Sequence, residues 1–201
     1  MTVAGLLGAL ASPDPTPGGG TAAAIAGAMG TSLLVMVTGL AKSKSNTDDE
    51  KAALAGARAE LEPITARLTQ LADADTEAFN AVMAAYRLPK ATDDEKAARS
   101  RAIQDGLRAA TVVPLDTLRA CAIAIDHGRA VAAHGNRSAS SDVGVAIGLL
   151  KAAADGAAAN VRINLTSLKD EVFRTATEDE TTRVLSAATA AASDAMRAVA
   201  T

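Results

Sequence analysis

Cysteine and histidine are scarce in this chain of 201 residues. Cys121 is the single cysteine, so the chain can form no internal disulfide, and a metal cluster held by several thiolates is excluded. His127 and His134 are the only histidines, which is too few for most zinc or iron sites. A Mg²⁺ ion bound by carboxylates stays open, although no pattern points to one. We therefore expect no metal and no cofactor, and the free thiol suits the reducing cytoplasm.

Aromatic residues and an excess of either charge are lacking as well. Aromatic residues make up 1% of the chain, and 20 Lys and Arg against 23 Asp and Glu give a net charge of −3. No basic stripe is interleaved with aromatic rings, so nucleic-acid binding has no support. The amino terminus has no basic segment followed by an apolar core, so we expect no signal peptide.

One stretch without any charge, Thr21 to Ala41, is long enough to cross a bilayer. Alanine, glycine, serine and threonine supply most of it, and large apolar residues are a minority. Such a composition is typical of a helix that touches other protein on all sides. We therefore favour burial in a helical core or a subunit interface over a membrane span, and we expect no membrane association.

Small and aliphatic residues dominate what remains, since hydrophobic residues make up 49% of the chain. Alanine has the highest helix propensity, and no segment alternates apolar and polar residues as a strand would. Glycine and proline are sparse, which indicates few and long elements. We predict one all-α domain over residues 1–201, an antiparallel bundle of about six helices. The expected helices are Val3 to Leu10, Thr21 to about Ala41, Asp48 to Tyr86, Asp93 to about His134, Ser141 to about Leu168, and Thr177 to Val199.

Several local signals mark the ends and bends of these helices. Two capping boxes are expected, Thr47 with Glu50 and Thr92 with Glu95. A polar turn is expected from Ser43 to Thr47, and Ser140 or Ser141 is expected to cap the fifth helix. Pro63 should kink its helix, and Pro114 should bend or break the next one near its middle.

The turn before the charge-free helix is the strongest local signal for a binding site. It reads Pro15-Thr16-Pro17-Gly18-Gly19-Gly20-Thr21. Backbone N–H groups at a helix start lack partners and carry partial positive charge, so a carboxylate, a phosphate or a developing oxyanion could bind there. No Gly-Lys-Ser/Thr follows, so the turn is not a P-loop. A rigid turn that permits close helix packing explains the glycines equally well.

A second candidate is a stripe on the third expected helix. Asp75 and Phe79 are one turn apart, and Tyr86 returns to nearly the same face after three turns, roughly 16 Å along the helix. A basic segment that ends in Lys90 follows. This stripe could hold a long ligand with a flat ring at one end and an anion at the other. A solvated acid beside two core aromatic residues is the simpler alternative.

A third candidate lies on the fifth expected helix. Asn160 and Asn164 are one turn apart in an apolar run, where they either tie helices together or read the polar edge of a ligand. Asp142 shares their face but precedes Asn160 by five turns, roughly 27 Å, so the two cannot grip the same atom from one chain. The two could serve opposite ends of one site or two sites shared between subunits, and Asp142 could also simply complement the helix dipole. Gly144 and Gly148 indicate a tight helix crossing.

Taken together, four segments resemble the cyclodeaminase/cyclohydrolase family, which includes the cyclodeaminase half of formiminotransferase-cyclodeaminase and the stand-alone methenyltetrahydrofolate cyclohydrolases. The segments occur in the family's order and are Pro15 to Ala28, Asp73 to Lys90, Val113 to Leu115, and Gly135 to Asp170. Thr21 stands where the family usually has serine, which keeps the hydroxyl. Ala41 to Lys44 departs from the family's pattern at the end of the second helix.

The resemblance implies a dimerising helical bundle that binds a folate substrate between subunits and needs no metal. Its reactions act on the one-carbon unit between folate N5 and N10, and they require a general acid/base. We assign that role to Asp142, with Asp75 as the second choice, and we expect Asn160 and Asn164 to hydrogen-bond to the pterin edge. The rest of the expected substrate-binding set is Lys90 and the amides of Gly18, Gly19 and Gly20, which would hold the glutamate tail, together with Thr16 and Phe79.

Hydrolysis of 5,10-methenyltetrahydrofolate to 10-formyltetrahydrofolate is the favoured reaction, because the chain lacks the formiminotransferase half that would supply formimino-folate. The first alternative is a formimidoyltetrahydrofolate cyclodeaminase, which releases ammonia and forms methenyltetrahydrofolate. The second belongs to another class, a folate-binding or scaffold dimer without turnover.

Overall fold

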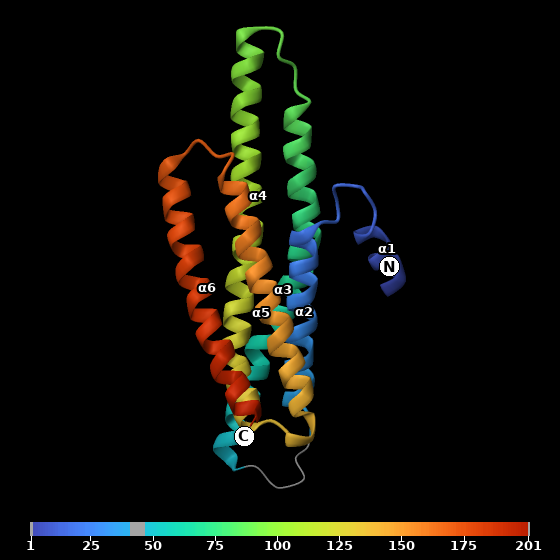
Figure 1. Cartoon of the computed structure of the whole chain (residues 1–201), viewed down its shortest axis with the longest axis vertical. Helices are drawn as coiled ribbons and strands as arrows, with labels where there is room; N and C mark the ends of the chain where they lie inside the picture. The colour runs from blue at the N-terminus through green and yellow to red at the C-terminus, as the bar shows by residue number, and fades with distance from the viewer. Residues whose placement is uncertain (1, 41–46, 201) are drawn as a thin grey trace.

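The computed structural model of the chain describes residues 2–40 and 47–200, and these residues form helices and no strand. The elements are α1 (Val3–Leu10), α2 (Gly19–Thr38), α3 (Asp48–Tyr86), α4 (Asp93–His134), a short 3₁₀ turn η1 (Arg137–Ala139), α5 (Ser140–Leu165) and α6 (Glu171–Ala200). Figure 1 shows α2 to α6 running up and down side by side, with the α3–α4 hairpin projecting beyond the others and α1 standing to one side. The all-α prediction is confirmed.

One face of helix α2 packs inside the bundle against α3, α4 and α5, while Met29 and Met36 on its outer face are exposed. Its glycines allow this approach, because a Cβ at Gly27 would lie 2.9 Å from Cys121 Sγ and one at Gly30 would lie 2.7 Å from the Ala146 carbonyl oxygen. By length and composition α2 could span a membrane, yet half of its most apolar window is buried inside the protein. These helix contacts account for the missing charges on the buried face of α2.

Proline does not interrupt the long helices. Both α3 and α4 run unbroken through Pro63 and Pro114, so the break considered at Pro114 is wrong, while the expected kinks stay predictions. A proline in a helix leaves the carbonyl four residues earlier without its N–H partner. For Pro114 that carbonyl belongs to Ala110, and the Asn164 side chain donates to it at 2.9 Å. A neighbouring helix thus supplies the missing donor.

The helix ends differ in part from the expected ones. Both capping boxes are present. Helix α2 ends at Thr38, before Gly39. The turn expected from Ser43 to Thr47 lies outside the described residues, apart from Thr47 itself, and so do Lys42 and Lys44. Helix α6 begins at Glu171 instead of Thr177, since the Asp170 carboxylate accepts the Phe173 N–H at 3.0 Å and caps the helix earlier.

The start of α5 also corrects the prediction. Neither Ser140 nor Ser141 caps it, because η1 runs directly into the helix and the Asn136 side chain caps η1 by accepting the Ser138 N–H at 3.0 Å. At its other end α5 stops at Leu165. The tight crossing expected at Gly144 and Gly148 is absent, since a Cβ at Gly148 would meet no atom of the described residues within 4 Å.

Candidate functional site

The glycine turn leads directly into α2 and leaves the start of that helix open. Gly18 is the N-cap residue, and no side chain caps it. The first N–H groups of an α-helix have no carbonyl partner inside the helix, and they form the positive end of its dipole. Thr16 and Gly18 are half-buried, and Gly19 is exposed. This end of α2 can therefore stabilise a carboxylate or an oxyanion.

The carboxylate at this end of α2 is that of Asp75, which comes from α3. Thr21 Oγ1 donates a hydrogen bond to Asp75 Oδ2 at 2.9 Å. A Cβ at Gly20 would lie only 2.2 Å from Asp75 Oδ1, so the carboxylate occupies the space that any other residue at position 20 would fill. The acid ranked second from the sequence thus lies against the glycine turn, and Gly20 serves to admit it.

Asn160 approaches the same turn from α5. Its Nδ2 lies 3.7 Å from the position of a Cβ at Gly19 and donates to the Gly156 carbonyl at 2.8 Å. Within the described residues no donor reaches the Asn160 side-chain oxygen, which leaves it available to an N–H group of a ligand. The structure therefore brings Asn160, Asp75 and the glycine turn together from three helices.

Asn164 has a structural partner instead. Its amide donates to the Ala110 carbonyl of α4, the group that Pro114 leaves unpaired. Of the two possibilities open for this residue, a tie between helices is the one that the geometry favours.

The stripe along α3 ends in a basic pocket. Phe79 follows Asp75 by one turn and is half-buried, and Tyr86 is exposed at the end of the helix. Beyond it lies a pocket of about 480 Å³ whose charged lining residues are all cationic: Lys90, Lys96, Arg99 and Lys169. Arg99 also donates to the Tyr86 carbonyl at 2.9 Å. An anionic group held here would be roughly 16 Å from Asp75 along α3.

Asp142 lies at the other end of the bundle. Helices α2 and α5 pack side by side, with Gly19 beside Asn160 and Gly30 beside Ala146. Asp142, in the first turn of α5, is five turns before Asn160 and hence roughly 27 Å away. Within one chain, the structure does not bring Asp142 to the glycine turn.

A larger apolar groove of about 750 Å³ separates α1 from the outer face of α2 and part of α3. Its lining includes Val3 and Met29, which are 76% and 54% exposed, and Asp73. No residue of α1 is buried. The groove thus presents aliphatic surface to the outside and a single carboxylate.

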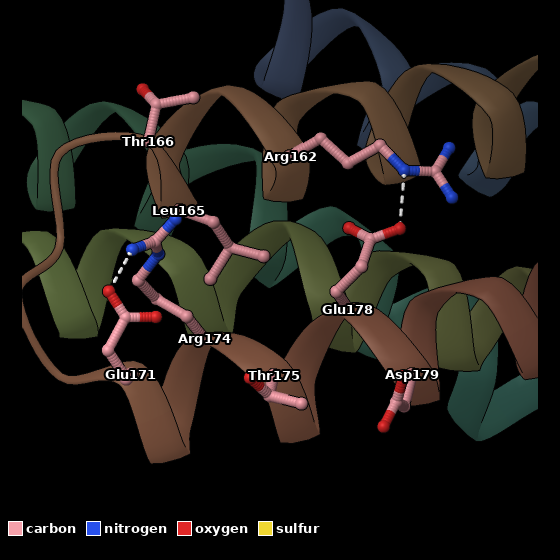
Figure 2. A pocket seen from close by; sticks show the side chains of 8 residues that line it. All are labelled: Arg162, Leu165, Thr166, Glu171, Arg174, Thr175, Glu178 and Asp179. Atoms are coloured by element: carbon pink, nitrogen blue, oxygen red, sulfur yellow. Dashed lines mark hydrogen bonds and ion pairs between the residues drawn. The ribbon is translucent and has the colours of Figure 1, made fainter.

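Figure 2 shows a smaller cleft of about 370 Å³ between the end of α5 and the start of α6. Four of its five charged side chains pair with one another, Arg162 with Glu178 at 3.0 Å and Arg174 with Glu171 at 2.5 Å, and the fifth is Asp179. Both cations of the cleft are already paired and have little to offer an anionic ligand, so we assign it no functional role.

The described residues offer neither a metal-binding cluster nor a reactive thiol. Among the described residues, no group of three or more His, Cys, Asp or Glu side chains could hold a metal ion. Burial raises the pKa of the Cys121 thiol to about 12, so this side chain is not a nucleophile near neutral pH.

Sequence reasoning missed two parts of this arrangement. The sequence indicates only that Thr21 keeps a hydroxyl, whereas in the structure this hydroxyl donates a hydrogen bond directly to Asp75. Lys96, Arg99 and Lys169 had not been grouped with Lys90, because they come from α4 and the α5–α6 connection. Thr21 and Asp75 lie on different helices and are 54 residues apart, so no helical periodicity in the sequence could have paired them.

Comparison with known proteins gives consistent matches. The model of the formiminotransferase-cyclodeaminase family matches residues 2–183. The chain is 45% identical over 172 residues to the methenyltetrahydrofolate cyclohydrolase of Methylorubrum extorquens, which covers 86% of this chain and 83% of that protein. It is 34% identical to the formimidoyltransferase-cyclodeaminase of Gallus gallus, over 88% of this chain but only 33% of the relative's own length.

The fold has a close counterpart among solved structures. The crystal structure of formiminotetrahydrofolate cyclodeaminase from Thermotoga maritima superposes with a TM-score of 0.87 at 26% sequence identity. The match covers 100% of this chain and 96% of that one.

Proposed function

Because the chain belongs to the formiminotransferase-cyclodeaminase family, we propose that it is a folate enzyme that hydrolyses 5,10-methenyltetrahydrofolate to 10-formyltetrahydrofolate. The observation that carries this proposal is the 45% identity to a methenyltetrahydrofolate cyclohydrolase along most of both chains. The bifunctional relatives are less similar, and the chain spans about a third of their length.

The reaction needs a group that moves one proton. Water adds its hydroxyl to the cationic carbon between N5 and N10, and its proton passes to a base. The same group then gives that proton to N5 as the bond between N5 and the carbon breaks. The proton of the added hydroxyl leaves to solvent as the formyl carbonyl forms on N10. A carboxylate can serve as this base and acid, and it also offsets the positive charge of the substrate.

We propose Asp75 for this role in place of our first choice, Asp142. Its position beside the glycine turn supports the assignment, because the carboxylate lies against Gly20, next to the Asn160 side chain that would hold the substrate. The Asn160 side-chain oxygen, also near this turn, would accept an N–H of the pterin edge. Asp142, roughly 27 Å away by helix geometry, would then serve only as a first-turn acid of α5.

The far end of the ligand would extend along α3. Phe79 would pack against the flat ring that follows the pterin, and the glutamate tail would reach the basic pocket that contains Lys90. The distance of roughly 16 Å from Asp75 to this pocket suits a ligand of that length. The glycine amides are then left to the reacting end of the substrate.

One observation favours cyclodeaminase activity as a second candidate. The Thermotoga maritima structure belongs to a formiminotetrahydrofolate cyclodeaminase that this chain covers almost entirely. In that reaction N10 attacks the formimino carbon on N5 and ammonia leaves with a proton, and Asp75 could supply that proton equally well.

We also propose that two copies associate through α1 and the outer face of α2. An isolated helix of eight residues is unstable in water, and none of the residues of α1 is buried. Met29 and Met36 continue this apolar surface along α2, and contiguous apolar patches of this kind mark association surfaces. Sedimentation of the wild-type protein and of Met29→Glu tests the proposal. We expect a wild-type dimer and a monomeric variant, and a wild-type monomer would refute the proposal.

The function itself is tested by incubating the purified protein with 5,10-methenyltetrahydrofolate and following the loss of its absorbance. Formimino-tetrahydrofolate is assayed in parallel with detection of ammonia. We expect turnover of the first substrate that exceeds any turnover of the second. Turnover of the second alone would make the chain a cyclodeaminase, and binding of folate without either reaction would make it a binding module.

A further inference from the structure

We propose that Thr21 is a positioning residue that holds the Asp75 carboxylate in its reactive orientation. The proposal rests on the assignment of Asp75 as the acid/base. Thr21 is only 6% exposed, and its hydroxyl donates to Asp75 Oδ2 at 2.9 Å. Thr76 Oγ1 lies farther away at 3.4 Å and can donate to the Thr21 oxygen, so it need not compete with the carboxylate for the Thr21 proton.

Other buried threonines of the chain use their hydroxyls differently. Thr31 donates to the Gly27 carbonyl at 2.7 Å, and Thr111 donates to the Leu107 carbonyl at 2.7 Å. Both are the ordinary bonds of a helical threonine to its own helix, four residues back. Thr21 instead sends its proton across to α3, to an ionisable side chain. Because α2 begins at Gly19, Thr21 has no carbonyl of its own helix four residues back, and its hydroxyl bonds to α3 instead.

Gly20 completes the cradle from the other side. A Cβ there would lie 2.2 Å from Asp75 Oδ1 and 2.8 Å from Oδ2, so both carboxylate oxygens rest close to the α2 backbone. The missing side chain at Gly20 fixes how near Asp75 comes. The hydroxyl of Thr21 fixes which way the carboxylate is turned. Together they determine the direction in which Asp75 presents its lone pairs to a substrate.

The decisive variant is Thr21→Val, which keeps the shape of the side chain and removes the hydroxyl. We expect kcat to fall about 10- to 100-fold, the range that hydrogen bonds to charged groups span, with KM changed less than about twofold. Thr21→Ser keeps the hydroxyl and should restore kcat to within about threefold of the wild type. A purely structural role would lower the melting temperature and the fraction of active protein without this split between kcat and KM.

Thr31→Val is the matched control, since it removes a buried hydroxyl from the same helix that bonds only to backbone. Its kcat should equal that of the wild type. Thr21→Ala is the second variant in case Thr21→Val does not fold, with active-site titration by a tight-binding folate to count competent sites. Wild-type kcat in Thr21→Val or Thr21→Ala, or an equal loss in Thr31→Val, overturns the proposal. A wild-type protein that turns over neither folate instead overturns the proposed function.

Discussion

Replacing Gly20 with alanine should lower catalysis while leaving the protein folded. The new Cβ would lie 2.2 Å from Asp75 Oδ1, whereas a non-bonded carbon and oxygen approach to about 3.3 Å. The carboxylate must therefore move by about 1.1 Å, and a displacement of about 1 Å can cost on the order of 100-fold in rate. We expect kcat to fall by about that factor.

The free energy of unfolding of the same variant should fall only slightly, because two opposing effects of the new methyl group partly cancel. Overpacking costs about 1–3 kcal/mol, and alanine recovers up to about 1 kcal/mol over glycine in a helix. Steady-state turnover of methenyltetrahydrofolate and thermal unfolding, measured on the same preparation, give both numbers. Gly56→Ala is the control, because Gly56 is exposed in α3 and its new Cβ would meet nothing within 4 Å. Wild-type kcat in Gly20→Ala would refute the contact between Gly20 and Asp75.

Three further variants test the rest of the molecule. Asn164→Leu should lower the free energy of unfolding by about 1–3 kcal/mol in denaturant titration, because it leaves the Ala110 carbonyl unpaired, while kcat stays unchanged. The hydrogen bonds from Arg119 hold the pKa of Glu180 below its ordinary value of 4.5. This pair therefore stabilises the fold at pH values above 4.5, and the stabilisation disappears as the pH falls through the lowered pKa of Glu180. Glu180→Gln should therefore melt at a lower temperature than the wild type at pH 7, modestly because the pair is partly exposed, and the difference should narrow in acid. Lys169→Glu should raise KM for the folate about 5- to 10-fold at low salt with kcat retained, whereas an unchanged KM would remove the basic pocket from substrate binding.

The fold followed from the sequence because its signals are local. Alanine content, the capping boxes at Thr47 and Thr92 and the prolines at the ends of helices each act within a few residues. The errors have two causes, a contact with a distant residue at Pro114 and a local cap at a different residue before α6. Pro114 does not break α4, since Asn164 replaces the lost donor, and α6 begins early because Asp170 rather than a residue near Thr177 caps it.

The candidate site was predicted only in its parts. The glycine turn, Asp75 and Asn160 were each identifiable by residue type, but their meeting depends on how α2, α3 and α5 pack. Asp142 and Asn160 share a helix face, but helix periodicity cannot say which neighbouring helix a face meets. The register of α2 against α3, which brings Thr21 to Asp75, is a property of the packed bundle alone.

The central claim is that the carboxylate beside the glycine turn transfers the proton. The most direct test compares the rates of methenyltetrahydrofolate hydrolysis by Asp75→Asn and Asp142→Asn in one assay. Loss of a general acid/base costs about 100- to 10,000-fold, so we expect kcat of Asp75→Asn to fall by at least 100-fold. Asp142→Asn should keep nearly the full rate. The reverse pattern, with Asp75→Asn active and Asp142→Asn inactive, would contradict the assignment.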